Sequence, residues 1–179
     1  NDQGKQVNEG RIFRVRPKSQ DNPVDVGQLA KGPGEQTVAE LIEDFASPLP
    51  VRRTDAQEEL LRRGPKAALA LKHLLEGQAV SMAIETWSVW TLGRMSLTDA
   101  RLERYFARQA AVGSVNRRIQ ALRILGHRIH HSEDWRELPD DAIESVFAEE
   151  PRIRLAAVLA IRRAKQKQAI DVLLDSLSS

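Results

Sequence analysis

Three histidines have a spacing that suits a metal ion. His127, His130 and His131 fall at positions i, i+3 and i+4 near the end of an expected helix, which brings them close to one face. Glu133 or Asp134 could complete such a site. Imidazoles also suit the last turn of a helix, and no second ligand cluster supports these three. We therefore expect structural histidines, with no metal ion and no other cofactor in this segment.

No group of side chains predicts a catalytic centre. Asp140, Asp141 and Glu144 fit the negative charge preferred at a helix N-terminus better than they fit a paired acid and base. The chain has no cysteine, which excludes thiol catalysis, disulfides and thiolate metal sites. It also lacks a glycine-rich phosphate loop and a nucleophile elbow. The prediction is that this segment has no catalytic residue and is not an enzyme.

Tryptophans and arginines remain as candidates for binding. An indole buries about 150–250 Å² when it packs, so an exposed pair at Trp87 and Trp90 would form an interaction hot spot. Because tryptophans are mostly buried, packing of both against a neighbouring helix is the favoured interpretation. The arginines are also explained by the helix dipole. The candidate interaction surface consists of Glu85, Trp87, Trp90, Arg118, Arg123 and Arg154.

These candidates belong to a repeated pattern that predicts the fold. A small residue is followed four positions later by an aliphatic residue, and the small residues are spaced by 32, 33 and 36 positions. A repeat of this length made of two helices predicts an α-solenoid. The four pairs are Ala56 and Leu60, Ser88 and Leu92, Ala121 and Leu125, and Ala157 and Ile161.

The start of the chain differs from the rest. Arg11–Arg16 alternates as a short strand would, and a stretch rich in glycine and proline follows it. Thr37 with Glu40 forms a capping box that begins the first helix. We predict an extended segment and linker over 1–36 and an all-α superhelix over 37–179. The superhelix would contain about four helical hairpins and a final helix from Ala169 to Leu177.

The second helix of each hairpin resembles the second helix of HEAT repeats. In that family an arginine is typically followed by a small residue three positions later and by Leu-Gly at the helix end. The helices beginning near Arg118 and Arg154 match well, whereas Glu85 replaces the arginine in the second unit and the first unit is the weakest copy. The resemblance covers about four-fifths of the chain and implies a HEAT-like solenoid.

The junction between the two parts resembles planctomycete-type membrane-bound dehydrogenases. The resemblance rests on Gly10-Arg11-Ile12-Phe13-Arg14-Val15, the linker, Val51-Arg52-Arg53-Thr54 and Leu60-Leu61-Arg62-Arg63. In that family a β-propeller precedes the HEAT region and a c-type haem domain follows. The resemblance implies a closing propeller strand within 1–36, a larger redox-linked parent protein and an extracytoplasmic or cell-envelope location. It assigns no catalytic residue, because haem attachment needs cysteine.

Two functions follow as hypotheses. The preferred one is a non-catalytic scaffold or protein-interaction module that docks other domains of the parent chain or a separate protein. The alternative is a HEAT-like DNA-binding or DNA-glycosylase-type enzyme with a basic concave groove, in which Glu85 would supply the carboxylate. A net charge of only +2 argues against nucleic acid. A mean hydropathy of −0.42 argues against membrane insertion.

Overall fold

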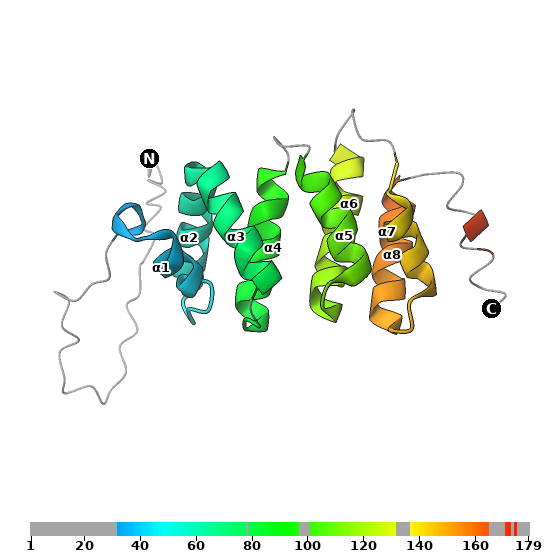
Figure 1. Cartoon of the computed structure of the whole chain (residues 1–179), viewed down its shortest axis with the longest axis horizontal. Helices are drawn as coiled ribbons and strands as arrows, with labels where there is room; N and C mark the ends of the chain where they lie inside the picture. Colours follow the sequence, from blue (N-terminus) through cyan, green and yellow to red (C-terminus); the bar gives the residue numbers. More distant parts are fainter. Residues whose placement is uncertain are drawn as a thin grey trace, which may run out of the picture. The chain divides into compact units, whose positions relative to one another are not determined.

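The computed structural model describes residues 32–77, 79–96, 101–131 and 137–164, together with 171, 172 and 174 (Figure 1). Within these residues every regular element is a helix, which confirms the predicted all-α fold. The strand expected at Arg11–Arg16 and most of the final helix expected at Ala169–Leu177 lie outside the described residues. The elements are η2 (Pro33–Glu35), α1 (Val38–Asp44), α2 (Pro50–Arg63), α3 (Pro65–Gly77), α4 (Met82–Met95), α5 (Arg101–Val112), α6 (Val115–His131), α7 (Asp140–Glu144), η3 (Ser145–Phe147) and α8 (Pro151–Ala164).

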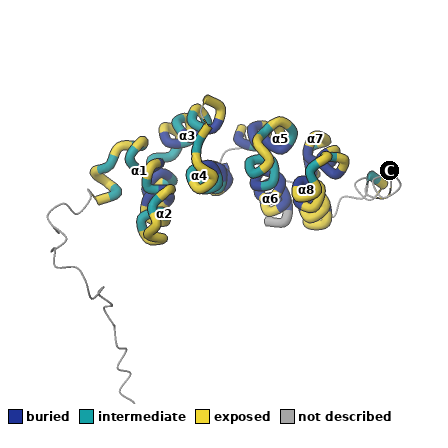
Figure 2. Tube along the Cα trace, turned by 90° about the horizontal axis from the view of Figure 1, so that it is seen from below, coloured by how far each residue is buried: buried dark blue, intermediate teal, exposed yellow. Residues whose placement is uncertain are grey.

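The helices pair in sequence order into four hairpins. The first helices of the pairs are α1, α3, α5 and α7, and the second helices are α2, α4, α6 and α8. Each second helix contacts the next, so that α4 packs on α2, α6 on α4 and α8 on α6. Figure 2 shows the buried residues turned toward the interior of this stack. The chain is therefore a HEAT-like helical-repeat scaffold.

The repeated small and aliphatic residues form the core of the stack. All eight are buried, and they lie in the second helices, where close approach to neighbouring helices requires short side chains. Leu60, Leu92 and Leu125 are fully enclosed. The sequence period therefore reports a packing requirement that each repeat meets in the same way.

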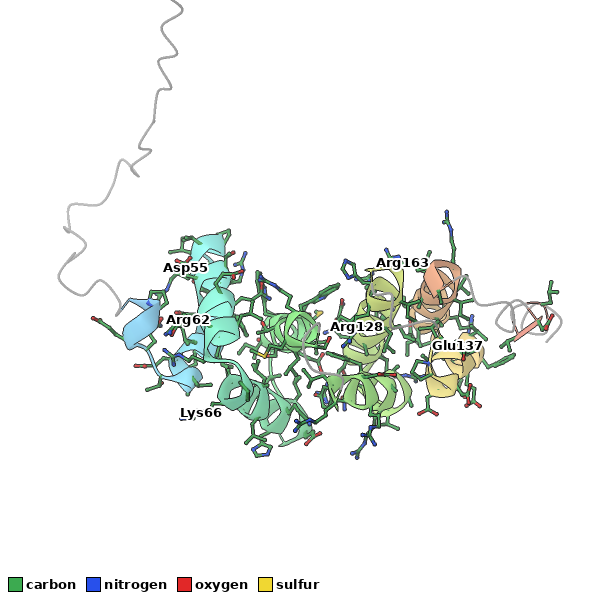
Figure 3. The ribbon with its side chains drawn as sticks, turned by 90° about the horizontal axis from the view of Figure 1, so that it is seen from above. Asp55, Arg62, Lys66, Arg128, Glu137 and Arg163 are labelled. Carbon is green, nitrogen blue, oxygen red and sulfur yellow. The ribbon has the colours of Figure 1, made fainter. Side chains whose placement is uncertain are left out.

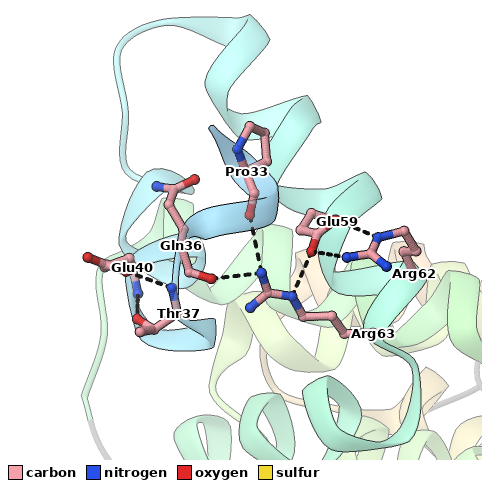
Figure 4. Close-up of polar contacts among 7 residues, drawn as sticks. All are labelled: Pro33, Gln36, Thr37, Glu40, Glu59, Arg62 and Arg63. Atoms are coloured by element: carbon pink, nitrogen blue, oxygen red, sulfur yellow. Dashed lines mark hydrogen bonds and ion pairs between the residues drawn. The ribbon is translucent and has the colours of Figure 1, made fainter. Parts of the chain in front are cut away.

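Residues just before the first helix are bonded to the helical unit. The Arg63 guanidinium donates to the Pro33 carbonyl at 3.2 Å and to the Gln36 carbonyl at 2.7 Å (Figure 4). The same guanidinium pairs with Glu59 at 2.8 Å. Four residues of the predicted linker, 33–36, thus pack on α2, while the division of the chain at residue 36 stays a prediction.

The predicted capping box is present at the start of α1. Thr37 Oγ1 accepts from the Glu40 amide at 3.2 Å, and Glu40 Oε2 accepts from the Thr37 amide at 2.6 Å. We expect Thr37→Ala to lower the free energy of unfolding by about 1 kcal/mol, because the Glu40 amide loses the hydroxyl that accepts from it. Urea unfolding followed by circular dichroism measures this loss. Thr54→Ala is the control, since the Thr54 hydroxyl only bonds to the Pro50 carbonyl within α2; an equal loss in both variants would contradict the capping role.

Candidate protein-binding surface

Three arginines at the same repeat position bind backbone carbonyls near the end of the preceding helix. Arg53 Nη1 donates to Ser47 O at 2.5 Å, and Arg118 Nε donates to Ala110 O at 2.8 Å. Arg154 Nη1 likewise donates to Ala148 O at 2.8 Å and to Glu149 O at 2.9 Å. Carbonyls at helix ends have no partner within their own helix, so these guanidiniums complete the hairpin. Arg118 and Arg154, predicted as interaction residues, therefore have a structural task.

Glu85 occupies that arginine position in the second repeat, but it binds side chains of the next repeat in place of a carbonyl of the preceding helix. Its side chain is buried, with 7% of the residue exposed, and it accepts from Ser114 Oγ at 2.8 Å and Asn116 Nδ2 at 2.7 Å. Arg117 Nη2 lies 2.9 Å from the same carboxylate. Burial acts to raise the pKa of Glu85, but the bonds from Asn116, Ser114 and Arg117 outweigh it and lower that pKa.

The Glu85 carboxylate therefore joins α4 to the first turn of α6. All its partners belong to the next repeat, and none of them was predicted as a site residue. The sequence did contain a signal for this pairing. Glu85 replaces the repeated arginine, and the next repeat has an additional arginine, Arg117, that could neutralise it. A carboxylate engaged in this way is not poised to act on a flipped base, as the DNA-glycosylase alternative requires.

The two tryptophans lie at successive junctions between repeats, and both are half-buried. The Trp87 ring stacks on Phe45 with centroids 5.8 Å apart, and the Arg53 guanidinium lies 5.9 Å from the Trp87 ring. Trp90 Nε1 donates to Gln120 Oε1 at 3.1 Å, which ties its indole to α6. Trp87 thus joins the first two repeats, and Trp90 joins the second to the third.

A small pocket opens where α4 meets α6, beside Trp90. It encloses about 60 Å³ and is lined by Trp90, Gly93, Arg94, Ile124, His127 and Arg128. Arg123 Nη1 reaches the Gln120 oxygen that Trp90 also binds, at 3.4 Å. We name the half-buried Trp90 and the exposed Arg94, Arg123 and His127 around this junction the seam cluster. Arg94 and His127 were not predicted as members of an interaction surface.

Arg94 extends the seam cluster back to the first repeat. Its guanidinium donates to Gln57 Oε1 at 3.0 Å and pairs with Glu58 at 2.5 Å. The hydrogen bond from Arg94 lowers the pKa of Glu58. Gln57 Nε2 in turn donates to Thr91 Oγ1 at 3.2 Å. Polar bonds therefore run from α2 through α4 to α6 along the second helices.

Basic residues recur at one further position of the repeat. Each second helix carries a basic side chain six residues after its small residue, namely Arg62, Arg94, His127 and Arg163. Figure 3 labels two of these, Arg62 on α2 and Arg163 on α8. Arg62 pairs with Glu59, which is also bound by Arg63, and these bonds lower the pKa of Glu59 to about 2. Arg163 forms no ion pair with any residue that the structure describes.

The charge of the chain is unevenly distributed among its helices. α6 and α8 each contain four arginines and no aspartate or glutamate, whereas α1 and α7 each contain three acidic residues and no basic one. The net charge of +2 conceals this segregation. An acidic ligand would be attracted to the second helices of the last two repeats.

The structure places one of the three histidines considered for metal binding. His127 is exposed in α6, whereas the side chains of His130, His131, Glu133 and Asp134 lie outside the described part of the chain. Among the residues that are described, no group of three histidine, aspartate or glutamate side chains could hold a metal ion. The same residues include no helix with the length and apolar character needed to cross a membrane.

Comparison with known proteins supports the fold. No protein-family model and no curated protein match the sequence. A solved structure that matches is the complex of CpcE and CpcF of phycocyanin lyase from Nostoc sp. PCC7120. The identity is 21%, the TM-score is 0.55, and the match covers 79% of this chain and 89% of the other. At this identity the likeness shows the shared helical-repeat fold alone.

The resemblance to membrane-bound dehydrogenases is wrong. The structural neighbour is a phycocyanin lyase complex, which is neither a dehydrogenase nor a haem-binding protein, and no family model supports the earlier assignment. Part of the resemblance came from the arginine pairs, but Arg53 binds a carbonyl between the helices of the first hairpin and Arg63 binds carbonyls of residues 33 and 36. The redox-linked parent protein and the extracytoplasmic location lose their support with it.

The prediction that this segment is not an enzyme is also corrected. The solved structure with this fold belongs to a lyase, which is an enzyme. The sequence argument treated the absence of familiar motifs as evidence against catalysis. That inference is weak for a helical repeat, because side chains from several repeats can form one site without any local motif.

Proposed function

We propose that this chain is a protein-binding subunit that docks an acidic segment of a partner protein on the seam cluster. The observation that carries the proposal is the position of the half-exposed Trp90 indole beside three basic side chains. Aromatic and arginine side chains contribute most of the binding energy in protein interfaces. The two-chain complex formed by the structural neighbour supports a protein partner.

The seam cluster is held in a defined geometry before any partner binds. Gln120 accepts from both Trp90 and Arg123, and Arg94 is fixed by Glu58 and Gln57. Side chains held in this way lose little conformational entropy on binding. An acidic segment would place an apolar side chain against the indole and carboxylates near Arg123 and His127.

Charge on α6 favours an acidic ligand over a basic one. Arg117 pairs with a carboxylate, whereas Arg118 binds a backbone carbonyl and Arg123 binds a side-chain amide. Carbonyl and amide partners leave the positive charge uncompensated. The field at the seam is therefore positive.

Fluorescence anisotropy with a labelled glutamate-rich peptide containing one central phenylalanine tests the proposal. We expect the Arg123→Glu/His127→Glu double variant to weaken binding by about tenfold or more, because one attractive charge is reversed and a second repulsive charge is added. Trp90→Ala should weaken it by a similar factor through the lost indole contact. Circular dichroism and thermal unfolding verify that each variant is folded.

The matched control reverses two charges on a first helix. Arg104 and Arg108 are exposed on α5 and make no ion pair with the described residues, so Arg104→Glu/Arg108→Glu should leave the affinity almost unchanged. Equal losses in both double variants would refute a specific seam site. Equal binding of a lysine-rich peptide would refute acidic selectivity, and tighter binding of duplex DNA with a steep salt dependence would favour the nucleic-acid alternative.

A further inference from the structure

The last described second helix, α8, exposes a position that its equivalents bury. This position is the residue after the repeated small residue. This residue is 8% exposed at Gln57, 1% at Val89 and 0% at Leu122, but 37% at Val158. The first three are covered because α4, α6 and α8 pack on the helix before them. The corresponding position on α8 is exposed.

This face of α8 is an apolar stripe with arginine beside it. Leu155, Val158 and Leu159 are spaced at i, i+3 and i+4 and are all exposed, with Leu155 at 59%. Figure 2 shows the outer side of α8 as exposed. Arg162 lies one turn after Val158 and Leu159 and forms no hydrogen bond or ion pair with any residue that the structure describes. We name Leu155, Val158, Leu159 and Arg162 the end face.

Arg162 distinguishes the end face from the internal junctions of the stack. Its equivalents in the three preceding repeats are Leu61, Gly93 and Gly126. A Cβ added to Gly126 would lie 2.9 Å from Ala160 Cα, so α8 approaches α6 too closely for any side chain there. The internal junctions thus carry an apolar side chain or none at this position, whereas α8 carries a charged guanidinium. The end face therefore differs from them in presenting a positive charge that suits an acidic partner.

A second copy of this chain is also a poor occupant of the end face. A two-fold dimer through the end face would bring the arginines of one α8 close to those of the other. α8 carries four arginines and no acidic residue that could offset this repulsion. The occupant that fits is a helix with the opposite charge.

We infer that the end face docks an amphipathic helix of another protein, whose aliphatic residues are flanked by aspartate or glutamate. The aliphatic residues would cover Leu155, Val158 and Leu159, and a carboxylate would pair with Arg162. Helix docking onto an apolar stripe at this spacing is a recurrent mode of peptide recognition. The inference concerns a different surface from the seam cluster and does not depend on the function proposed for it.

Binding of two designed helical peptides, measured by fluorescence anisotropy, tests the inference. Both carry the same leucine stripe, flanked by glutamate in one and by lysine in the other. We expect the glutamate peptide to bind about tenfold tighter, and Arg162→Glu to remove most of that preference. Leu155→Asp/Leu159→Asp should abolish binding of both peptides, whereas the seam variant Arg123→Glu/His127→Glu should leave it intact.

The control variant places aspartates on other exposed aliphatic residues. Leu69 on α3 is 56% exposed, close to the value for Leu155, and Val112 on α5 is also exposed. Leu69→Asp/Val112→Asp should bind the glutamate peptide as the unmodified chain does. Equal binding of the two peptides, or an equal loss in the control, overturns the inference.

Two further measurements exclude other occupants. Sedimentation that shows a dimer of the unmodified chain, lost in Leu155→Asp/Leu159→Asp, would assign the end face to a second copy and overturn the inference. A melting temperature lowered by more than about 5 °C in that variant alone would show that the chain covers its own end face. We expect neither: the chain should sediment as a monomer, and the variant should melt near the temperature of the Leu69→Asp/Val112→Asp control.

Discussion

Replacing Gly126 with valine is expected to lower the free energy of unfolding by about 3 kcal/mol. The added side chain has no room between α6 and α8, so the two helices must move apart. A Cβ at this position would lie 2.9 Å from Ala160 Cα and 3.2 Å from Ala160 Cβ. The obstructing atom is backbone, which no change of rotamer can move. Urea unfolding monitored by circular dichroism measures the loss.

Two other glycines serve as controls for the Gly126 variant. A Cβ on Gly93 would meet Ile124 Cδ1 at 2.8 Å, but this atom is the end of a side chain and can rotate away. Gly93→Ala should therefore cost less than Gly126→Ala, and adding Ile124→Val should recover part of its cost. Gly77 has nothing within 4 Å of an added Cβ, so Gly77→Ala should be close to neutral. Equal effects at Gly126 and Gly77 would contradict close packing as the cause.

The signals for helix boundaries and repeat period in this sequence are local, which explains why the fold was predictable. The capping box at Thr37 and the small and aliphatic pairs act within one helix or between adjacent turns. The Leu125-Gly126 pattern, by contrast, does not mark the end of α6, which continues to His131 and buries Ile129. Local chemistry repeated four times thus carries enough information to identify a helical-repeat stack.

The candidate surface was less predictable because its contacts join different repeats. Trp90 meets Gln120, Arg94 meets Glu58, and Gln57 meets Thr91, and each of these contacts spans at least 30 positions of the chain. Periodicity places such residues on one side of the stack but does not pair them. Arg94 and His127 were missed for this reason.

The burial of Glu85 is the clearest example of a pairing that only the stacked repeats create. Its carboxylate lies among Ser114, Asn116 and Arg117. We expect Glu85→Gln to lower the free energy of unfolding by about 3 kcal/mol. The reason is that Arg117 is then left beside a neutral group in a poorly solvated junction. The Glu85→Gln/Arg117→Gln double variant should lose less than the sum of the two single variants. A coupling energy of about 1–3 kcal/mol in this double-mutant cycle would identify the pair.

The pH dependence of stability separates the charge of Glu85 from its packing. The pKa of Glu85 is lowered in the folded chain from its ordinary value of 4.5, so the folded state holds this proton less tightly than the unfolded state does. The stabilisation by the ionised carboxylate is therefore complete above the unfolded pKa and is lost as the pH falls through the folded one. The difference in stability between the unmodified chain and Glu85→Gln should be constant near neutral pH and should shrink below about pH 4.5. Urea unfolding at a series of pH values measures this difference. A difference that stays unchanged down to strongly acidic pH would show that Glu85 acts through its shape and not through its charge.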